Sequence, residues 1–199
     1  GIYRKIHPVA YVGRDDLEGG ITPGREVPVF ECDFGRLGIQ ICFDMVYDDG
    51  WEILRRKGAE IVAWPSASPA TAQPARRAWE GQFYIVSCTG RNNCSVFDPS
   101  GLVAAQLREK SGVLVEKVDL SYLLLHWSEQ VREGAAFRDR FGDRAGFRYS
   151  TQEDLGIFWS NDPDMTIGEM AREVGVDEVH VHIHRNRRLQ DAARGGPVR

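Results

Sequence analysis

The sequence predicts an α/β fold, because short apolar segments typical of strands alternate along the chain with segments that carry helix signals. Residues 35–41 alternate apolar with small or polar side chains, and residues 59–65 form a nearly continuous apolar run. Each is followed by a helical pattern, at 48–58 and 75–82. With 199 residues, 42% of them hydrophobic, the chain is long enough to bury a core. We therefore expect a sheet whose strands are connected by helices.

The first part of the chain is predicted to deliver a cysteine at the end of a strand. A lysine, Lys5, lies in the first apolar segment, and Gly35 provides a tight turn between two strand patterns that end before Cys42. A glycine-rich, acidic stretch separates these parts and is typical of a loop. The expected elements are a strand at 1–7, a loop at 11–24, and a hairpin of strands 29–34 and 36–41.

The next segments have clear start and stop signals. Asp48 occupies the cap position of a helical pattern that has basic residues in its last turn and ends at Gly58. The apolar run after it ends at Pro65, and a small-residue loop leads to the next helical pattern. The expected elements are helix 48–58, strand 59–65, helix 75–82 and strand 83–88.

The last hundred residues contain weaker patterns. An Asp-Pro-Ser-Gly turn centres a hairpin at 95–105, and Thr166 with Glu169 forms a capping box that opens a short helix closed by Gly175. The other expected elements are a strand at 112–119, an amphipathic helix at 120–133, a helix at 170–174 and a strand at 178–184.

Composition excludes several classes of protein. A net charge of −4 does not favour nucleic acid or an anionic membrane surface as a partner, and no apolar run approaches the length of a membrane span. The four cysteines lack paired metal-type spacing, and no secretory signal pattern is present, so a reducing cytoplasm is expected. The first residue is Gly1 rather than methionine, which leads us to expect truncation or processing.

Cys42 lies where a strand passes into a helix, and this position favours a reactive thiol. A thiol attacks only as thiolate, and the backbone N–H groups of such a turn favour negative charge on sulfur or on an oxyanion. The alternative is that Cys42 only fills the strand end, because cysteine is among the residues most often buried.

Several motifs together resemble the nitrilase superfamily, the carbon-nitrogen hydrolases, over roughly residues 1–147. They are the Tyr-Arg-Lys-x-His-Pro segment at Lys5, the Glu-Gly-Gly-x-x-Pro-Gly segment at Glu18, the Ile-Cys-Phe-Asp motif at Cys42, and the segments 62–67 and 95–101. The resemblance implies that the chain forms part of an α-β-β-α sandwich and carries a C-terminal extension.

The resemblance also implies catalytic roles. The family uses a cysteine nucleophile, a lysine and a general-base glutamate; Cys42 matches the first and Lys5 the second. Glu18 matches a second glutamate that positions substrate or holds the lysine, although it could be an ordinary solvated loop acid. The backbone N–H of Phe43 would help Lys5 to hold the oxyanion. The general-base glutamate normally lies upstream of the lysine motif, and no residue here matches it.

The implied function is hydrolysis of a non-peptide carbon-nitrogen bond through a cysteine thioester, without a cofactor. Amide or carbamoyl substrates are favoured over nitriles, because Phe43-Asp44 follows the nucleophile instead of the Trp-Glu pair of nitrilases proper. Without the upstream glutamate, the chain alone is expected to be inactive or very weak. The alternative is a non-catalytic assembly or regulatory module that keeps the fold.

The resemblance places a hydrolase domain, N-terminally incomplete, at 1–149 and an extension at 150–199. In the strand expected at 178–184, alternation would put three histidines on one face: His180, His182 and His184. They are weak candidates for a metal site; an edge strand used to form a homo-oligomer is the favoured interpretation. Residues 185–199 are basic and expected to be disordered, although Arg185, Arg187 and Arg188 could contact an acidic partner.

Overall fold

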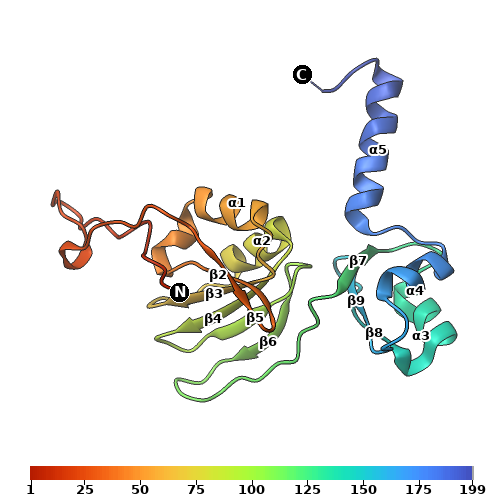
Figure 1. The fold of residues 1–199 in the computed structure, drawn as a ribbon, viewed down its shortest axis with the longest axis horizontal. Coiled ribbons are helices and arrows are strands. Elements are labelled where there is room, and N and C mark those ends of the chain that lie inside the picture. Colours follow the sequence, from red (N-terminus) through yellow and green to blue (C-terminus); the bar gives the residue numbers. More distant parts are fainter. Residues whose placement is uncertain (199) are drawn as a thin grey trace. The chain divides into compact units, whose positions relative to one another are not determined.

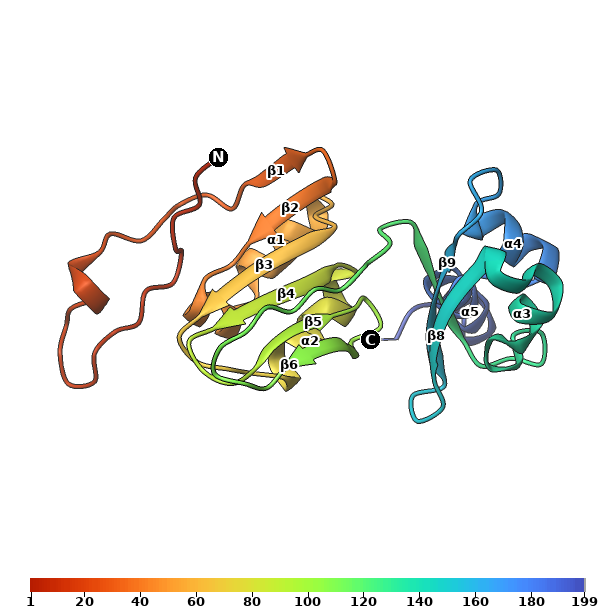
Figure 2. The ribbon, with the colours of Figure 1, turned by 90° about the horizontal axis from the view of Figure 1, so that it is seen from below.

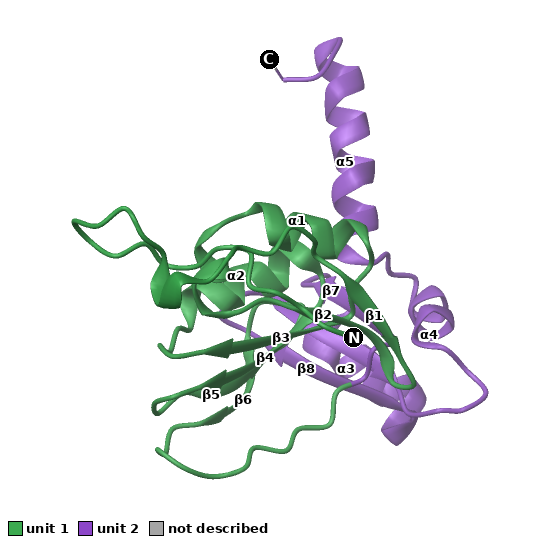
Figure 3. Ribbon diagram, turned by 60° about the vertical axis from the view of Figure 1, so that its left-hand side comes forward, with its two compact units in different colours: residues 1–118 green, residues 119–199 purple. Residues whose placement is uncertain are grey.

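A computed structural model describes residues 1–198 of the chain. It divides into two compact units, Gly1–Val118 and Asp119–Arg199, shown in green and purple in Figure 3. Each unit has its own sheet and its own hydrophobic core. The prediction of an α/β fold is confirmed, and the units are described separately below.

Unit 1 contains a six-stranded sheet in the order β1-β2-β3-β4-β5-β6 (Figure 2). Strands β2, β3 and β4 are parallel, while β1, β5 and β6 pair antiparallel with their neighbours. The strands are β1 Val29–Cys32, β2 Gly35–Ile39, β3 Ile61–Ser66, β4 Tyr84–Thr89, β5 Cys94–Phe97 and β6 Val103–Leu107. Because the carboxyl ends of parallel strands meet at one edge, residues that follow β2 and β3 lie near each other.

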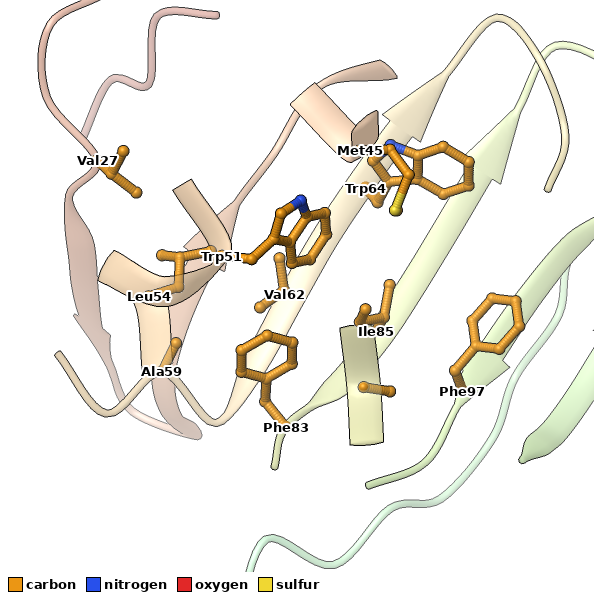
Figure 4. Close-up of a cluster of buried hydrophobic side chains, with 11 residues drawn as sticks. Val27, Met45, Trp51, Leu54, Ala59, Val62, Trp64, Phe83, Ile85 and Phe97 are labelled. Carbon is orange, nitrogen blue, oxygen red and sulfur yellow. The ribbon is translucent and has the colours of Figure 1, made fainter. Parts of the chain in front are cut away.

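Helices α1 (Asp49–Arg56) and α2 (Ala72–Gly81) cover the same face of this sheet (Figure 1). An α/β layer with helices on one face corresponds to half of an α-β-β-α sandwich. Gly38 of β2 allows α1 to approach closely, because a Cβ atom at that position would lie 2.7 Å from Leu54 Cδ2. Trp51, Leu54, Val62 and Phe83 form the centre of the core beneath the helices (Figure 4).

The predicted hairpin is confirmed, but its turn is Asp33-Phe34, and Gly35 pairs with Cys32 as the first residue of β2. The predicted helix and strand positions between 48 and 105 are also confirmed, with ends that shift by a few residues. Two short 3-10 helices lie at the motif positions: η1 (Glu18–Gly20) and η2 (Cys42–Val46).

Unit 2 contains a three-stranded antiparallel sheet in the order β7-β9-β8, packed with three α-helices. Its core includes Phe137, Phe158 and Met170, all fully buried. The elements are β7 Tyr122–His126, η3 Arg132–Gly134, α3 Ala135–Phe141, η4 Gly142–Arg144, β8 Ala145–Ser150, β9 Leu155–Ser160, α4 Ile167–Val174 and α5 Val179–Arg194. The capping box is confirmed: Thr166 Oγ1 accepts from Glu169 N, and the Glu169 carboxylate accepts from Thr166 N.

Four predicted elements are wrong, three of them before residue 134. Residues 1–7 and 112–119 form no strand in the described chain, and the helix expected at 120–133 is replaced by β7. β7 pairs with β9 along its whole length, from Tyr122–Trp159 to His126–Leu155. A leucine-rich run is compatible with either a helix or a buried strand, and here the presence of β9 as a pairing partner favours the strand.

The strand expected at 178–184 is helical instead and begins α5. Glu178 caps this helix, since its side chain accepts hydrogen bonds from the N–H groups of His180 and Val181. Arginine, leucine, glutamine and alanine then continue it, all of which are good helix formers. The same helix corrects the expectation of disorder in residues 185–199, because it extends to Arg194.

The boundary between the compact units lies at 118/119, whereas the predicted end of the hydrolase domain was 149/150. The predicted boundary lies inside β8, which pairs with β9 within unit 2. The prediction concerned where the family resemblance ends, and it stays a prediction. In the part of the chain that the structure describes, every helix falls short of the length and apolar character needed to cross a bilayer.

Candidate active site

Cys42 lies just beyond the carboxyl end of β2, as the first residue of η2. Its backbone has φ 48°, in the left-handed region that residues other than glycine rarely occupy. Trp64 Nε1, from β3, donates a hydrogen bond to the Cys42 carbonyl over 3.1 Å. Such strained backbone persists where surrounding contacts enforce it, and it is common at functional sites. The strand-to-helix turn predicted for this cysteine is confirmed.

Lys5 and Glu18 form an ion pair through Nζ and Oε1. The lysine side chain is only 11% exposed and the glutamate side chain 34%. The hydrogen bond from Lys5 lowers the pKa of Glu18 below its ordinary value. Glu18 is held in place by its own N–H, which donates to the Val9 carbonyl over 2.8 Å. The two residues that the motifs singled out in different segments are therefore in direct contact.

Asp44 joins the lysine segment to the nucleophile turn. Its side chain is fully buried. Oδ2 accepts from Tyr3 Oη and from Ile41 N, both over 2.8 Å. Oδ1 accepts from His7 N over 2.7 Å, and His7 Nδ1 lies 3.2 Å from the same oxygen. Tyr3 and His7 flank Lys5 in the sequence, so one carboxylate ties both sides of the lysine to the turn.

The His7 ring is fixed on its other sides as well. It stacks on Tyr47 with ring centroids 3.9 Å apart, and its Nε2 lies 3.4 Å from Asp49 Oδ2. Trp51 Nε1 donates to the Asp44 carbonyl over 3.1 Å, which connects the turn to α1. These contacts make residues 41–51 and the lysine segment one continuous packed structure.

Arg77 supports η2 from α2. Its side chain is 8% exposed, and Nη2 donates to the carbonyls of Met45 and Tyr47 over 3.3 and 3.1 Å. Nη1 lies 2.6 Å from Asp48 Oδ1, and the guanidinium sits over the Trp51 ring. The hydrogen bond from Arg77 lowers the pKa of the Asp48 carboxyl. A cavity of about 260 Å³ beside Arg77 is lined by residues of α1 and α2 and does not include Cys42 or Lys5.

The structure thus brings together Lys5 and Glu18, and it links their segment to Cys42 through Asp44. Among residues 1–198, no hydrogen bond or ion pair joins Lys5 Nζ to Cys42 Sγ, and none uses the Phe43 N–H. Sequence reasoning did not assign roles to Asp44 or Arg77. Asp44 stands inside the nucleophile motif, but an acidic residue is seldom fully buried, so the pattern did not distinguish it from a surface acid.

The three histidines of the metal hypothesis do not share a face, because they lie on α5 rather than on a strand. At 100° per residue, His180 and His184 project from one side of a helix and His182 from the other. No group of three or more potential metal ligands occurs within residues 1–198. His182 instead contacts the His126 ring, with centroids 4.8 Å apart, and its Nε2 lies 2.7 Å from Asn186 Nδ2.

Sequence comparison finds relatives among amidases. The chain is 33% identical over 144 residues to human deaminated glutathione amidase, covering 61% of this chain and 44% of that protein. It is 25% identical over 120 residues to an omega-amidase of Danio rerio, covering 52% and 43%. The chain therefore spans less than half the length of these curated relatives.

Solved structures give similar coverage. A nitrilase-superfamily protein from Saccharomyces cerevisiae matches with a TM-score of 0.47 and 23% identity over 54% of this chain and 44% of the other. The NitFhit protein of C. elegans matches with a TM-score of 0.48 and 27% identity over 54% and 32%. The model of the family described as carbon-nitrogen hydrolase matches residues 1–124, well over half of the sequence. The chain belongs to the carbon-nitrogen hydrolase family, within the nitrilase superfamily.

Proposed function

We propose that this chain carries the nucleophile of an amidase-type hydrolase that cleaves a non-peptide carbon-nitrogen bond through a Cys42 thioester. The observation that supports this most is the left-handed turn at Cys42, joined through buried Asp44 to the segment that holds the Lys5–Glu18 ion pair. Acyl transfer by a thiol uses a presented nucleophile and a cation that stabilises the oxyanion, and Cys42 and the largely buried Lys5 are the candidates for these two roles.

In the proposed reaction, Cys42 Sγ forms a bond to the carbonyl carbon of the substrate. Negative charge develops on the carbonyl oxygen, where Lys5 and the Phe43 N–H stabilise it. The carbon-nitrogen bond breaks, and the amine or ammonia leaves with a proton. Water then cleaves the thioester to release the acid and restore the thiol. Glu18 holds Lys5 in place through their ion pair.

Both proton transfers need a general base. The family resemblance assigns this task to a glutamate upstream of the lysine motif, and no motif in the present sequence matches it. We therefore expect the 199-residue chain by itself to release little or no ammonia from amides. A polypeptide that also contains this glutamate is expected to be active, and replacement of Cys42 by alanine is expected to abolish that activity.

Amides and carbamoyl compounds are the proposed substrates. The residues after the nucleophile are Phe43-Asp44 rather than Trp-Glu, and the relatives' names describe amidases of deaminated glutathione and of omega-amides. Three test substrates distinguish the substrate classes: an omega-amide of a dicarboxylic acid, an N-carbamoyl amino acid and an aliphatic nitrile. Turnover of the nitrile alone would contradict the preference.

The reactivity of Cys42 tests the proposal on the chain as it stands. Cys88 is exposed, whereas Cys42, Cys32 and Cys94 are half-buried, so exposure alone predicts that iodoacetamide modifies Cys88 first. An activated Cys42 is expected to react on the order of tenfold faster than Cys88. Peptide mapping by mass spectrometry after short exposure measures both rates, and urea-denatured protein is the control in which the difference disappears. Equal or slower modification of Cys42 would favour a non-catalytic module.

We also propose that the protein functions in a reducing cytoplasm and forms a homo-oligomer. Free thiols at all four cysteines support the first proposal. The homo-oligomer was inferred from an edge strand at 178–184, but this segment is helical. The proposal of assembly therefore rests on the family resemblance alone. Light scattering coupled to gel filtration measures the oligomeric state directly, and a monomeric mass would overturn the expectation.

A further inference from the structure

Asp44 is the one carboxylate of the site that is fully buried, and its hydrogen bonds connect two parts of the chain about forty residues apart. A buried carboxylate is costly unless donors satisfy both oxygens. Here Oδ2 accepts from Tyr3 and Ile41, and Oδ1 accepts from the backbone and lies near the ring of His7. Each oxygen therefore has at least one contact to the lysine segment.

The same residue closes the nucleophile turn. Asp44 N donates to the Ile41 carbonyl over 3.0 Å, while Ile41 N donates back to Asp44 Oδ2 over 2.8 Å. These reciprocal bonds span Cys42 and Phe43. They hold Cys42 at its positive φ, a conformation that is unfavourable for a residue with a side chain.

The groups that donate hydrogen bonds to Asp44 are suited to a permanent connection between the two segments. Burial, together with the Asp44 carboxylate, raises the pKa of Tyr3, so its hydroxyl remains a donor through the physiological range. Backbone N–H groups of Ile41 and His7 supply two more bonds that do not titrate. Lys5 lies midway between Tyr3 and His7, and its low exposure indicates that it faces inward from this anchored segment.

We propose that Asp44 is a positioning residue, which holds Cys42 in its left-handed turn and ties the segment that carries Lys5 to that turn. The proposal rests on the proposed function, because it concerns how the nucleophile is presented. Asp44 itself touches neither the substrate nor the thiol; it acts through Ile41, Tyr3 and His7. Its loss should lower the reactivity of Cys42 selectively, without a matching effect on the other cysteines.

Two variants test this. Tyr3→Phe removes one donor to Oδ2 and leaves the turn itself intact, so it is the variant that preserves the fold. Asp44→Asn keeps one acceptor oxygen and replaces the other with an NH₂ group. The contacts of either Oδ1 or Oδ2 therefore lose their acceptor. Asp33→Asn, at an exposed position in the β1–β2 turn of the same unit, is the matched control.

The readout is the ratio of iodoacetamide modification rates at Cys42 and Cys88, with circular dichroism as the check on folding. Tyr3→Phe is expected to lower the ratio about fivefold, the effect of one lost hydrogen bond, and Asp44→Asn by about tenfold or more. Asp33→Asn is expected to leave it unchanged. If Asp44→Asn does not fold, Tyr3→Phe carries the test alone.

The outcomes separate this proposal from the proposed function. A wild-type ratio at or below one contradicts the activated nucleophile itself. A high wild-type ratio that Tyr3→Phe leaves unaltered overturns the role of Asp44 while the nucleophile stands. An equal fall in modification at both cysteines also overturns it, because a purely structural role would change reactivity generally.

Discussion

A comparison of two arginines shows how burial changes the contribution of an arginine–carboxylate ion pair to stability. Arg77 in unit 1 lies 2.6 Å from Asp48 with its side chain 8% exposed, and Arg140 in unit 2 lies 2.8 Å from Glu173 with its side chain 53% exposed. Their distances to the carboxylates are nearly equal. Arg77 also donates to the backbone carbonyls of Met45 and Tyr47 at the end of η2, whereas the hydrogen bond and the ion pair of Arg140 both go to the Glu173 carboxylate.

The difference lies in what each arginine leaves behind when it is removed. Exposed ion pairs contribute little to the free energy of unfolding, because water solvates both partners when they separate. Removing a buried guanidinium that donates to backbone carbonyls leaves those acceptors without their donor, and the Met45 carbonyl is buried. The nucleophile region thus depends on buried polar contacts, while the surface of α3 and α4 does not.

The largest expected effect is that of Arg77→Met. Methionine retains much of the apolar length that packs on Trp51, but it leaves the Met45 and Tyr47 carbonyls without their donor. We expect a loss of about 2–3 kcal/mol in the free energy of unfolding of unit 1. Urea denaturation with hydrogen exchange measures this and assigns the change to unit 1. A loss below about 0.5 kcal/mol, the range of surface substitutions, would remove the distinction between the two arginines.

A smaller, pH-dependent effect is expected from the partly exposed pair of Lys5 and Glu18. Pairing lowers the Glu18 pKa below 4.5 in the folded protein, so the folded state binds a proton at this group less readily than the unfolded state. The stabilisation is therefore complete above the unfolded pKa and is lost as the pH falls through the lower, folded pKa.

The comparison of wild type with Glu18→Gln isolates this contribution. The difference in the free energy of unfolding is expected to be constant near neutral pH and to shrink as the pH falls below 4.5, the ordinary value of the Glu18 carboxyl. Asp15→Asn, at an exposed position in the same loop, is expected to show no such convergence. Thermal denaturation at several pH values measures all three proteins, and a difference independent of pH would mean that the pair is already solvated.

Much of unit 1 follows from local sequence, because its strands and helices have both periodicity and explicit ends. β2 begins at Gly35 and is followed by the nucleophile turn, and α1 ends just before Gly58. Parallel pairing of β2, β3 and β4 then places Cys42 at a strand edge. Lys5 and Glu18 were found through motifs, and the structure places them in direct contact, while the role expected for Glu18 stays a prediction.

Local sequence did not predict the structure correctly where tertiary contacts or neighbouring segments determine it. The alternation in 179–183 matches that of β2, but β2 has ladder partners on both sides, whereas residues 179–183 follow a helix cap and precede helix formers. The role of Asp44 could not be predicted for a related reason. Its significance comes from donors about forty residues earlier in the chain, which no local pattern records.

The smallest expected effect is that of Arg140→Met, the exposed counterpart of the Arg77 substitution. The pair with Glu173 is half-exposed on both sides, so the change in the free energy of unfolding is expected to stay within about 0.5 kcal/mol. The same denaturation experiment measures it, and added salt should diminish even this difference, because exposed charges are screened. An effect as large as that of Arg77→Met would show that Arg140 stabilises unit 2 through more than its ion pair. Burial would then not separate the two arginines, whose carboxylate partners are almost equally close.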